Sequence, residues 1–337
     1  MQSRSFPSAV AASLALALTL GAGLSCKKKT GAPGATPSKS APLAIETPKQ
    51  ATVIAEGAPI GATLVATLGA ASKLISPRGV AVDDAGNVYV ADTGKHRIVK
   101  LDGTGKELLA FGQEGRESGQ FEQPWVVSTT PKGEVAVLDA SSNYIQTFTG
   151  DGALVSRICG PGKPGFYAPR GMGVALDGIF YVADTGNDRL VPVTAAGEVK
   201  NADWRSLGKA PIKQVSDVSV GKSGLLRVYQ PSGAEGRGVL FEVTPQNELR
   251  GWWVMPPSAA TADASKTAEL SDGRLVASDP QQQRFIVISA DRSSFSPVQT
   301  EGLKLLAPGA VAVSKDDHVF LVDSRAGVVH HLKLSGK

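Results

Sequence analysis

Cysteine and histidine are scarce in this chain. Cys26 and Cys159 are the only cysteines among 337 residues, and only four histidines occur. A scaffold held by several disulfides and a zinc finger with its closely spaced Cys and His ligands are therefore excluded. The sequence also lacks a CxxC pair, a nucleophile elbow and a phosphate-binding loop. The common local signals of catalysis are thus missing.

Excess charge of one sign is lacking as well over most of the chain. Lys and Arg number 35 against 31 Asp and Glu, which gives a net charge of +4. Residues 1–50 contain six basic residues and one acidic residue, so residues 51–337 carry a net charge of −1. Binding of nucleic acid through its phosphates requires a strongly basic body. We therefore expect no nucleic-acid partner.

No apolar run is long enough to span a bilayer comfortably, but the first residues form an export signal. Arg4 precedes an Ala-, Leu- and Val-rich run over residues 9–20, which predicts a secretion signal. The pair Ser25-Cys26 resembles a bacterial lipobox, although Gly23 stands where Leu is preferred. We expect residues 1–26 to be a lipoprotein-type signal peptide ending at Cys26, the lipidated residue. Ordinary cleavage nearby and an uncleaved anchor are the alternatives.

Residues 27–50 are rich in Pro, Ser, Thr, Ala and Lys and poor in aromatic residues. Such a composition cannot bury a core, so we expect a disordered tether. The chain would then be exported and held at a membrane by its N-terminal lipid, on the periplasmic or cell-surface side. Residues 51–337 remain for the folded domain.

A repeat fills that domain. The stretch from Pro77 to Gly112 has a closely similar copy that begins at Pro169. Weaker copies occur in the rest of the chain, at a spacing of about 45 residues. Each copy contains three or four short runs rich in Val, Ile, Tyr and Phe between Gly-, Asp- and Asn-bearing turns, which predicts antiparallel strands. The residue that ends the second strand of each copy is Asp92, Asp139, Asp184, Gln230, Asp279 and Asp323. The sequence therefore predicts an all-β, six-bladed β-propeller.

The two ends of the repeat complement each other. The sixth copy, from Pro308, stops after its third strand, whereas the stretch from Gly61 to Gly69 reads like the outer strand of the other copies. We therefore expect the N-terminal strand to close the last blade, which removes a long exposed sheet edge.

The residues PRGVAVD, GNVYVADTG and RIVK of the first copy, repeated closely in the third, resemble the NHL repeat. The resemblance extends from Pro77 to Leu334 and is weakest in the fourth and fifth copies. NHL propellers include lyases that cleave peptidyl-hydroxyglycine, RNA- and protein-binding modules, and extracytoplasmic sensor domains. The resemblance thus implies architecture more than activity.

Ligands of propellers usually bind where the inner strands and the loops of one face meet the central channel. The loops between second and third strands share this face with the links between blades. Eight residues are candidates for a ligand-binding rim: Arg78, Lys95, His96, Trp125, Arg170, Asn187, Gln282 and Arg325. Arg78, Trp125 and Arg170 occupy matching places in three blades and could together bind an anionic or sugar-like group. A solvent-facing rim without a ligand is the plain alternative.

Three copies place an Arg five residues after the conserved Asp. The pairs are Asp92 and Arg97, Asp184 and Arg189, and Asp279 and Arg284. A charge pair repeated at one blade position favours a structural ion pair over a ligand site.

The four histidines are expected to be dispersed and not to converge on one ion. His96 lies on a rim loop, His318 in a turn, and His330 with His331 on the third strand of the last blade. No catalytic residue, metal ligand or cofactor is assigned. A calcium ion with Asp217 as a contributor, or a zinc ion in the channel, stays open as an alternative.

The interpretation is a lipid-anchored, extracytoplasmic NHL-repeat propeller that acts as a non-catalytic binding or scaffold module. Its partner would be a protein, a peptide or a cell-envelope glycan. The alternative is a metal-dependent lyase or lactone hydrolase that uses the channel mouth.

Overall fold

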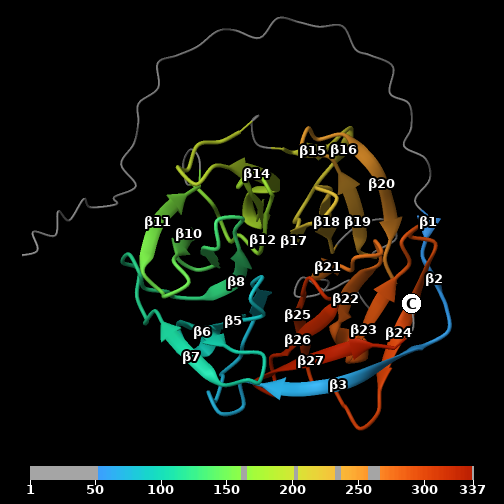
Figure 1. Cartoon of the computed structure of the whole chain (residues 1–337). Coiled ribbons are helices and arrows are strands. Elements are labelled where there is room, and N and C mark those ends of the chain that lie inside the picture. Colours follow the sequence, from blue (N-terminus) through green and yellow to red (C-terminus); the bar gives the residue numbers. More distant parts are fainter. Residues whose placement is uncertain (1–51, 161–164, 201–203, 232–236, 257–265, 336–337) are drawn as a thin grey trace, which may run out of the picture.

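A computed structural model describes residues 52–160, 165–200, 204–231, 237–256 and 266–335, which form six antiparallel blades around a central channel (Figure 1). The predicted six-bladed propeller is confirmed. Among the described residues, no helix is long and apolar enough to cross a membrane. The predicted signal peptide, its Cys26 and the predicted tether lie outside the described residues.

In blades one to three, the strands are arranged in chain order from the channel outward. Blade one consists of β4 (Gly79–Val82), β5 (Val88–Asp92), β6 (Arg97–Leu101) and β7 (Glu107–Phe111). Blade two consists of β8 (Pro124–Thr129), β9 (Val135–Asp139), β10 (Tyr144–Phe148) and β11 (Leu154–Cys159). Blade three consists of β12 (Gly171–Val174), β13 (Phe180–Asp184) and β14 (Arg189–Val193), whose outer edge forms isolated bridges to Trp204 and Val199.

A short hairpin of β15 (Ser206–Leu207) and β16 (Ala210–Pro211) precedes blade four. Blade four consists of β17 (Asp217–Val220), β18 (Leu226–Gln230), β19 (Val239–Val243) and β20 (Leu249–Val254). Blade five consists of β21 (Thr267–Glu269), β22 (Leu275–Asp279), β23 (Arg284–Ile288) and β24 (Ser294–Thr300). Blade six consists of β25 (Pro308–Val313), β26 (His318–Asp323), β27 (Val328–Leu334) and the N-terminal β3 (Ile60–Leu68).

The core consists of six apolar layers, one between each pair of neighbouring blades. In β5, Val88 and Val90 pack towards blade six, whereas Tyr89 and Ala91 pack towards blade two. This alternation follows from the two-residue period of a strand. Because β5 has a blade on each side, every one of its residues is buried. That burial explains why the second strands are almost wholly apolar.

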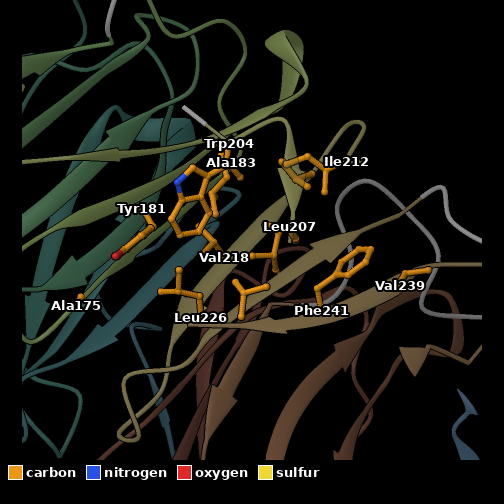
Figure 2. Close-up of a cluster of buried hydrophobic side chains, with 14 of the residues drawn as sticks. Ala175, Tyr181, Ala183, Trp204, Leu207, Ile212, Val218, Leu226, Val239 and Phe241 are labelled. Atoms are coloured by element: carbon orange, nitrogen blue, oxygen red, sulfur yellow. The ribbon is translucent and has the colours of Figure 1, made fainter. Parts of the chain in front are cut away.

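Figure 2 shows the layer between blades three and four. Tyr181 and Trp204 come from blade three, and their ring centroids are 5.7 Å apart. Leu226 and Phe241 of blade four complete the layer. Burial of such side chains contributes roughly 1.5–3 kcal/mol each, so these layers supply most of the stabilisation that joins the blades.

In five of the six blades, the described residues include a hydrogen bond from the preceding link to the buried polar residue that ends the second strand. Asp92 and Asp184 each accept a hydrogen bond of 2.7 Å from a link backbone N–H, that of Ile75 and that of Tyr167. Asp139 and Asp323 do the same with their own links, and Gln230 accepts the N–H of Lys213 at 2.8 Å. This contact gives a physical reason for the acidic residue that marks the repeat.

The predicted Asp–Arg pairs are also confirmed as structural. The Nε–Oδ2 distances are 2.9 Å for Arg97 and Asp92, 2.6 Å for Arg189 and Asp184, and 3.0 Å for Arg284 and Asp279. The carboxylates of all three pairs are buried. Each guanidinium therefore offsets the cost of burying a charge.

The N-terminal segment closes blade six as predicted. Leu68 of β3 pairs with Val329 of β27, and the antiparallel ladder continues to Ala62 and Leu334. Two further strands were not predicted: β1 (Thr52–Val53) pairs in parallel with β20 of blade four, and β2 (Ala55–Glu56) pairs in parallel with β24 of blade five. The segment therefore runs along the outer edges of three blades.

Deletion of residues 51–69 from the full chain should cause aggregation or unfolding, because β27 loses its partner and blade six exposes a long edge. Deletion of residues 51–57 alone is the matched control. It removes β1 and β2 but leaves β3, and should give a soluble monomer. Size-exclusion chromatography and thermal melts measure both. A 51–69 deletion that stays monomeric with an unchanged melting temperature contradicts closure by β3.

Two histidines meet in blade six. Nδ1 of His318 lies 2.6 Å from Nε2 of His331, and the buried His331 ring stacks on Phe320 with the centroids 4.4 Å apart. The expectation that the four histidines are dispersed is therefore wrong for this pair. Neighbouring strands place the two residues side by side although 13 positions separate them in the chain.

Burial lowers the pKa of His331 below its ordinary value of 6.5, and the positive charge of a protonated His318 lowers it further. Below about pH 6.5 the unfolded chain therefore binds a proton that the folded protein resists. The free energy of unfolding is therefore unaffected by His331 above this pH, and it decreases as the pH falls from about 6.5 towards the pKa of the folded state.

His331→Phe should flatten the decline of the unfolding free energy between about pH 7 and about pH 5, since Phe cannot be protonated. Val329→Ala, on the same strand, should lower stability equally at every pH. Denaturant melts across this range measure the slopes. Equal slopes for the wild type and His331→Phe contradict the assignment.

Candidate functional site

The six inner strands line a channel of about 1050 Å³, including the space at its open ends. Its wall consists of residues 79–82, 125–129, 172–174, 217–220, 222, 266–269 and 310–313. Most of these are small or apolar, so charged side chains gather only near the two ends. The channel can therefore present polar chemistry at its mouths and little between them.

Arg78, Trp125 and Arg170 come together at the mouth on the face of the blade links. The Cζ atom of Arg78 lies 4.1 Å from the centroid of the Trp125 ring, and that of Arg170 lies 5.3 Å from it. All three side chains are half-buried. The predicted convergence of residues from three blades is thus present, and both guanidinium groups interact with one indole.

Local backbone geometry produces this arrangement. Trp125 lies in a bulge, because the register of β8 against β9 shifts between Pro124 and Val126. Bulges re-aim side chains and occur often beside functional sites. Gly79 lets β4 approach β8, since a Cβ there would lie only 2.8 Å from the carbonyl oxygen of Trp125. The Arg-Gly pair of the repeat therefore brings Arg78 to the indole.

Lys266 and Asp217 form an ion pair at the same mouth, with Nζ 2.7 Å from Oδ1. Lys266 also donates to the carbonyl oxygen of Arg170 at 2.9 Å. One side chain of blade five thus ties blades three and four together. Asp217, which we considered as a calcium ligand, is buried in this ion pair.

Sequence reasoning missed Lys266. The position that matches Lys266 is Gly79 in blade one and Gly171 in blade three, whereas blade four has the charged Asp217 there. A charged residue where other blades have small ones is a signal that could have revealed it. The weak similarity of the fifth copy to the repeat hid this register.

A hollow of about 770 Å³ opens beside these charges, including the solvent at its entrance. Arg78, Trp125 and Lys266 line it. Its apolar wall is built from Pro77, Pro280, Ala307, Pro308 and Ala310. The arrangement suits a ligand that carries an anionic group beside an apolar one.

The other predicted rim residues serve the joints between blades or lie apart. Nζ of Lys95 donates to Ser72 O at 3.2 Å. His96 Nδ1 lies 2.7 Å from the carbonyl oxygen of Glu122, in the next link. Asn187 donates to Asp184 and to the carbonyl oxygen of Gly165. Gln282 and Arg325 are exposed on the loops of blades five and six, and neither lines the channel mouth.

The acidic residue of the opposite mouth belongs to a buried ionic cluster. Glu269 accepts a bond of 2.6 Å from Nη2 of Arg227, and Glu242 is 3.0 Å from Nε of the same Arg227 and 2.6 Å from Nη2 of Arg292. This cluster joins blades four and five. In the described part of the chain, no group of three or more His, Cys, Asp or Glu side chains could hold a metal ion.

Comparison with known proteins is consistent with this fold. The sequence model of the NHL repeat matches residues 74–101, which include β4, β5 and β6. A probable peptidyl-alpha-hydroxyglycine alpha-amidating lyase of Caenorhabditis elegans is 28% identical over 124 residues, or 34% of this chain and 35% of the lyase. Protein lin-41 of the same organism is 38% identical over 50 residues, or 15% of this chain and 4% of lin-41. The chain thus spans about a third of the first relative and far less of the second.

Solved structures share the architecture. Virginiamycin B lyase from Staphylococcus aureus superposes with a TM-score of 0.56 at 13% identity, over 77% of this chain and 80% of the lyase. The PQQ-bound aldose sugar dehydrogenase of Streptomyces coelicolor gives 0.59 at 14% identity, over 83% and 100% of the two chains. At these identities the likeness concerns the fold alone. The repeat match and the architecture together show a six-bladed β-propeller that contains an NHL repeat in its first blade.

Proposed function

We propose that this propeller is a non-catalytic binding module and that the channel mouth on the link face is its ligand site. The observation that carries the proposal is the grouping of Arg78 and Arg170 on the ring of Trp125, beside the hollow of about 770 Å³. Half-buried Trp and Arg are the residue types that dominate binding energy at interfaces. The mouth offers these groups on a rigid support of three blades.

The described residues of this mouth also give less support to a metal-dependent reaction than to binding. No cluster there could hold a metal ion, and Asp217 is engaged with Lys266. One of the similar structures is a catalytically inactive histidine-to-alanine variant of virginiamycin B lyase. In this chain the ring of His96 bonds to the link of blade two and does not line the hollow. His330 lies 3.9 Å from the buried Asp323 and does not line it either.

A lyase is the second candidate, because one relative is a probable peptidyl-alpha-hydroxyglycine lyase. The matched region covers 34% of this chain, so the similarity alone does not assign catalytic residues to this chain. Turnover of a peptidyl-hydroxyglycine peptide that a chelator abolishes would favour this candidate over the binding module.

We further propose that the module is exported and anchored through a lipid on Cys26, at the periplasmic or cell-surface side of a membrane. The sequence of the signal segment supports this location. The first strand of the propeller, β1, joins the outer edge of blade four. This strand lies at the edge of blade four that is farthest from the inner strand β17. The proposed partner of the channel mouth is a protein, a peptide or an envelope glycan.

Substitution of Arg78, Trp125 and Arg170 by Ala should lower capture of the partner from envelope extract by more than about tenfold, since central Arg and Trp contacts dominate such interfaces. The melting temperature should change by only a few degrees, because the core layers stay intact. Lys222→Ala, at the opposite mouth, is the matched control and should capture the partner normally. Quantitative mass spectrometry measures the captured species. Equal capture by the triple variant refutes the site.

Cys26→Ser should release the protein from the membrane fraction or stall its processing, because the lipid would supply the attachment and no helix among the described residues could cross a membrane. Fractionation and mass spectrometry of the mature N-terminus measure this outcome. An unmodified N-terminus at another position in the wild type contradicts the lipid anchor.

A further inference from the structure

Each link places one side chain at the corresponding point of the link face, and these side chains differ from blade to blade. The residue is the one whose backbone N–H bonds to the polar residue that ends a second strand. The five such residues in the described links are Ile75, Glu122, Tyr167, Lys213 and Leu306, from blades one, two, three, four and six. We call them the display ring. The corresponding residue of blade five lies outside the described residues.

The backbone of the display ring is held from two sides. Besides the bond to its own blade, a link contacts a residue with positive φ in the loop of the blade before it. Asp188 of blade three, whose φ is 51°, accepts the N–H of Gln214, next to Lys213, at 2.7 Å. The corresponding contacts pair His96 with Glu122, Asn143 with Ala168, and Gln283 with Leu306. A backbone that is ordered in the free protein loses little conformational entropy on binding.

The side chains of the display ring point away from this frame. Ile75, Tyr167 and Leu306 are 51%, 56% and 40% exposed. Lys213 is exposed as well, and Glu122 is half-buried. The residue just before each of them is instead a buried apolar one: Leu74, Phe121, Phe166, Ile212 and Leu305. The fold thus requires the buried neighbour but not a particular exposed side chain, and such variation among the loops of one face is typical of a recognition surface.

Two apolar members, Leu306 and Ile75, lie on the links of neighbouring blades. Asp323, in blade six, accepts the backbone N–H of Leu306 at 2.7 Å and, through its carbonyl oxygen, that of Gly327 at 2.9 Å. Gly327 packs on the link of blade one, since a Cβ there would lie 2.6 Å from the carbonyl oxygen of Leu74. Both links also contribute residues to the wall of the hollow. Leu306 and Ile75 are therefore held on adjoining links at the mouth.

The other members lie on further blades of the same face. The phenol ring of Tyr167 packs over the turn of blade three, because a Cβ at Gly186 would collide with it. Glu122 of blade two forms an ion pair of 2.7 Å with Arg116, and Lys213 lies in the link to blade four. The display ring thus includes residues of five blades. Contact with all of them requires a broad and rigid surface, such as that of a folded protein.

The chemistry of the display ring also favours a protein. Apolar, aromatic and charged side chains of both signs occur together, as they do in protein–protein interfaces. Ile75 and Leu306 offer no hydrogen bond to the hydroxyl groups of a glycan. The exposed Glu114 and Glu117, in the link to blade two, would be repelled by anionic lipid head groups.

We infer, on the basis of the proposed function, that the display ring is the surface by which the propeller recognises a folded protein partner. The partner places an apolar patch on Leu306 and Ile75, beside the mouth. It places an acidic group opposite the exposed ammonium group of Lys213. The constant backbone sets the geometry of the contact, and the variable side chains set its specificity.

Site-specific photo-crosslinking of the full chain in intact cells tests the inference. A photoreactive amino acid would replace Ile75, Tyr167 or Leu306, and in a matched control Leu176, which is 75% exposed in the turn between β12 and β13. All three display-ring positions should give adducts with the same protein, identified by its peptides, and position 176 should give none. Adducts with lipid or glycan alone, no protein adduct from the three positions, or equal adducts from position 176 would overturn the inference.

The crosslinked protein, once purified, is the probe for two sets of variants. Ile75→Ser with Leu306→Ser should weaken its binding by more than about tenfold, and Lys213→Glu by about fivefold, in calorimetry with folded variants. Leu176→Ser and Lys132→Glu, at exposed turns of the opposite face, should bind like the wild type. Equal affinities of the display-ring and control variants would contradict the inference. A protein adduct from position 307 with none from the display ring would leave the proposed function standing and refute the inference alone.

Discussion

The propeller depends on one repeated contact, the hydrogen bond from a link backbone N–H to the buried acidic residue that ends a second strand. Asp92, Asp184 and Asp323 each accept such a bond at 2.7 Å. An unpaired carboxylate in this position would be costly to bury. Since each link also leads into the next inner strand, the contact fixes where the inner strands begin and therefore where the channel mouth lies.

This constraint explains how polar residues on the link face divide between structure and function. Lys95 and Asn187 look like ligand contacts in the sequence, yet their side chains bond to the links. Thr93 likewise donates to the carbonyl oxygen of Pro124 in the next blade at 2.6 Å. These three residues, which all follow the second strand of a blade, thus hold neighbouring blades together. Trp125 stands in the second copy at the position where the first and third copies have Arg78 and Arg170. The motif does not require Trp there, which is consistent with a role in ligand binding.

Periodic and local features were predictable from the sequence. The strands and the Asp–Arg pairs recur at fixed spacings, so several copies gave the same prediction. The number of blades and the closing strand followed from counting these copies. The two-residue strand β1 has no such pattern and gains its place only by pairing with Trp253 and Val254. The Lys266–Asp217 ion pair joins the divergent fourth and fifth blades across 49 positions and forms only where these two blades pack together. Such contacts depend on tertiary structure, which spacing does not encode.

Site-specific photo-crosslinking in intact cells tests the central claim that the link-face mouth is the binding site. A photoreactive amino acid would replace Ala307, which lines the mouth, and in a matched protein Lys222, at the other end of the channel. We expect the variant at position 307 to form a specific adduct with a partner polypeptide and the variant at position 222 to form none. Adducts from position 222 alone, or from neither position in folded protein, would contradict the account.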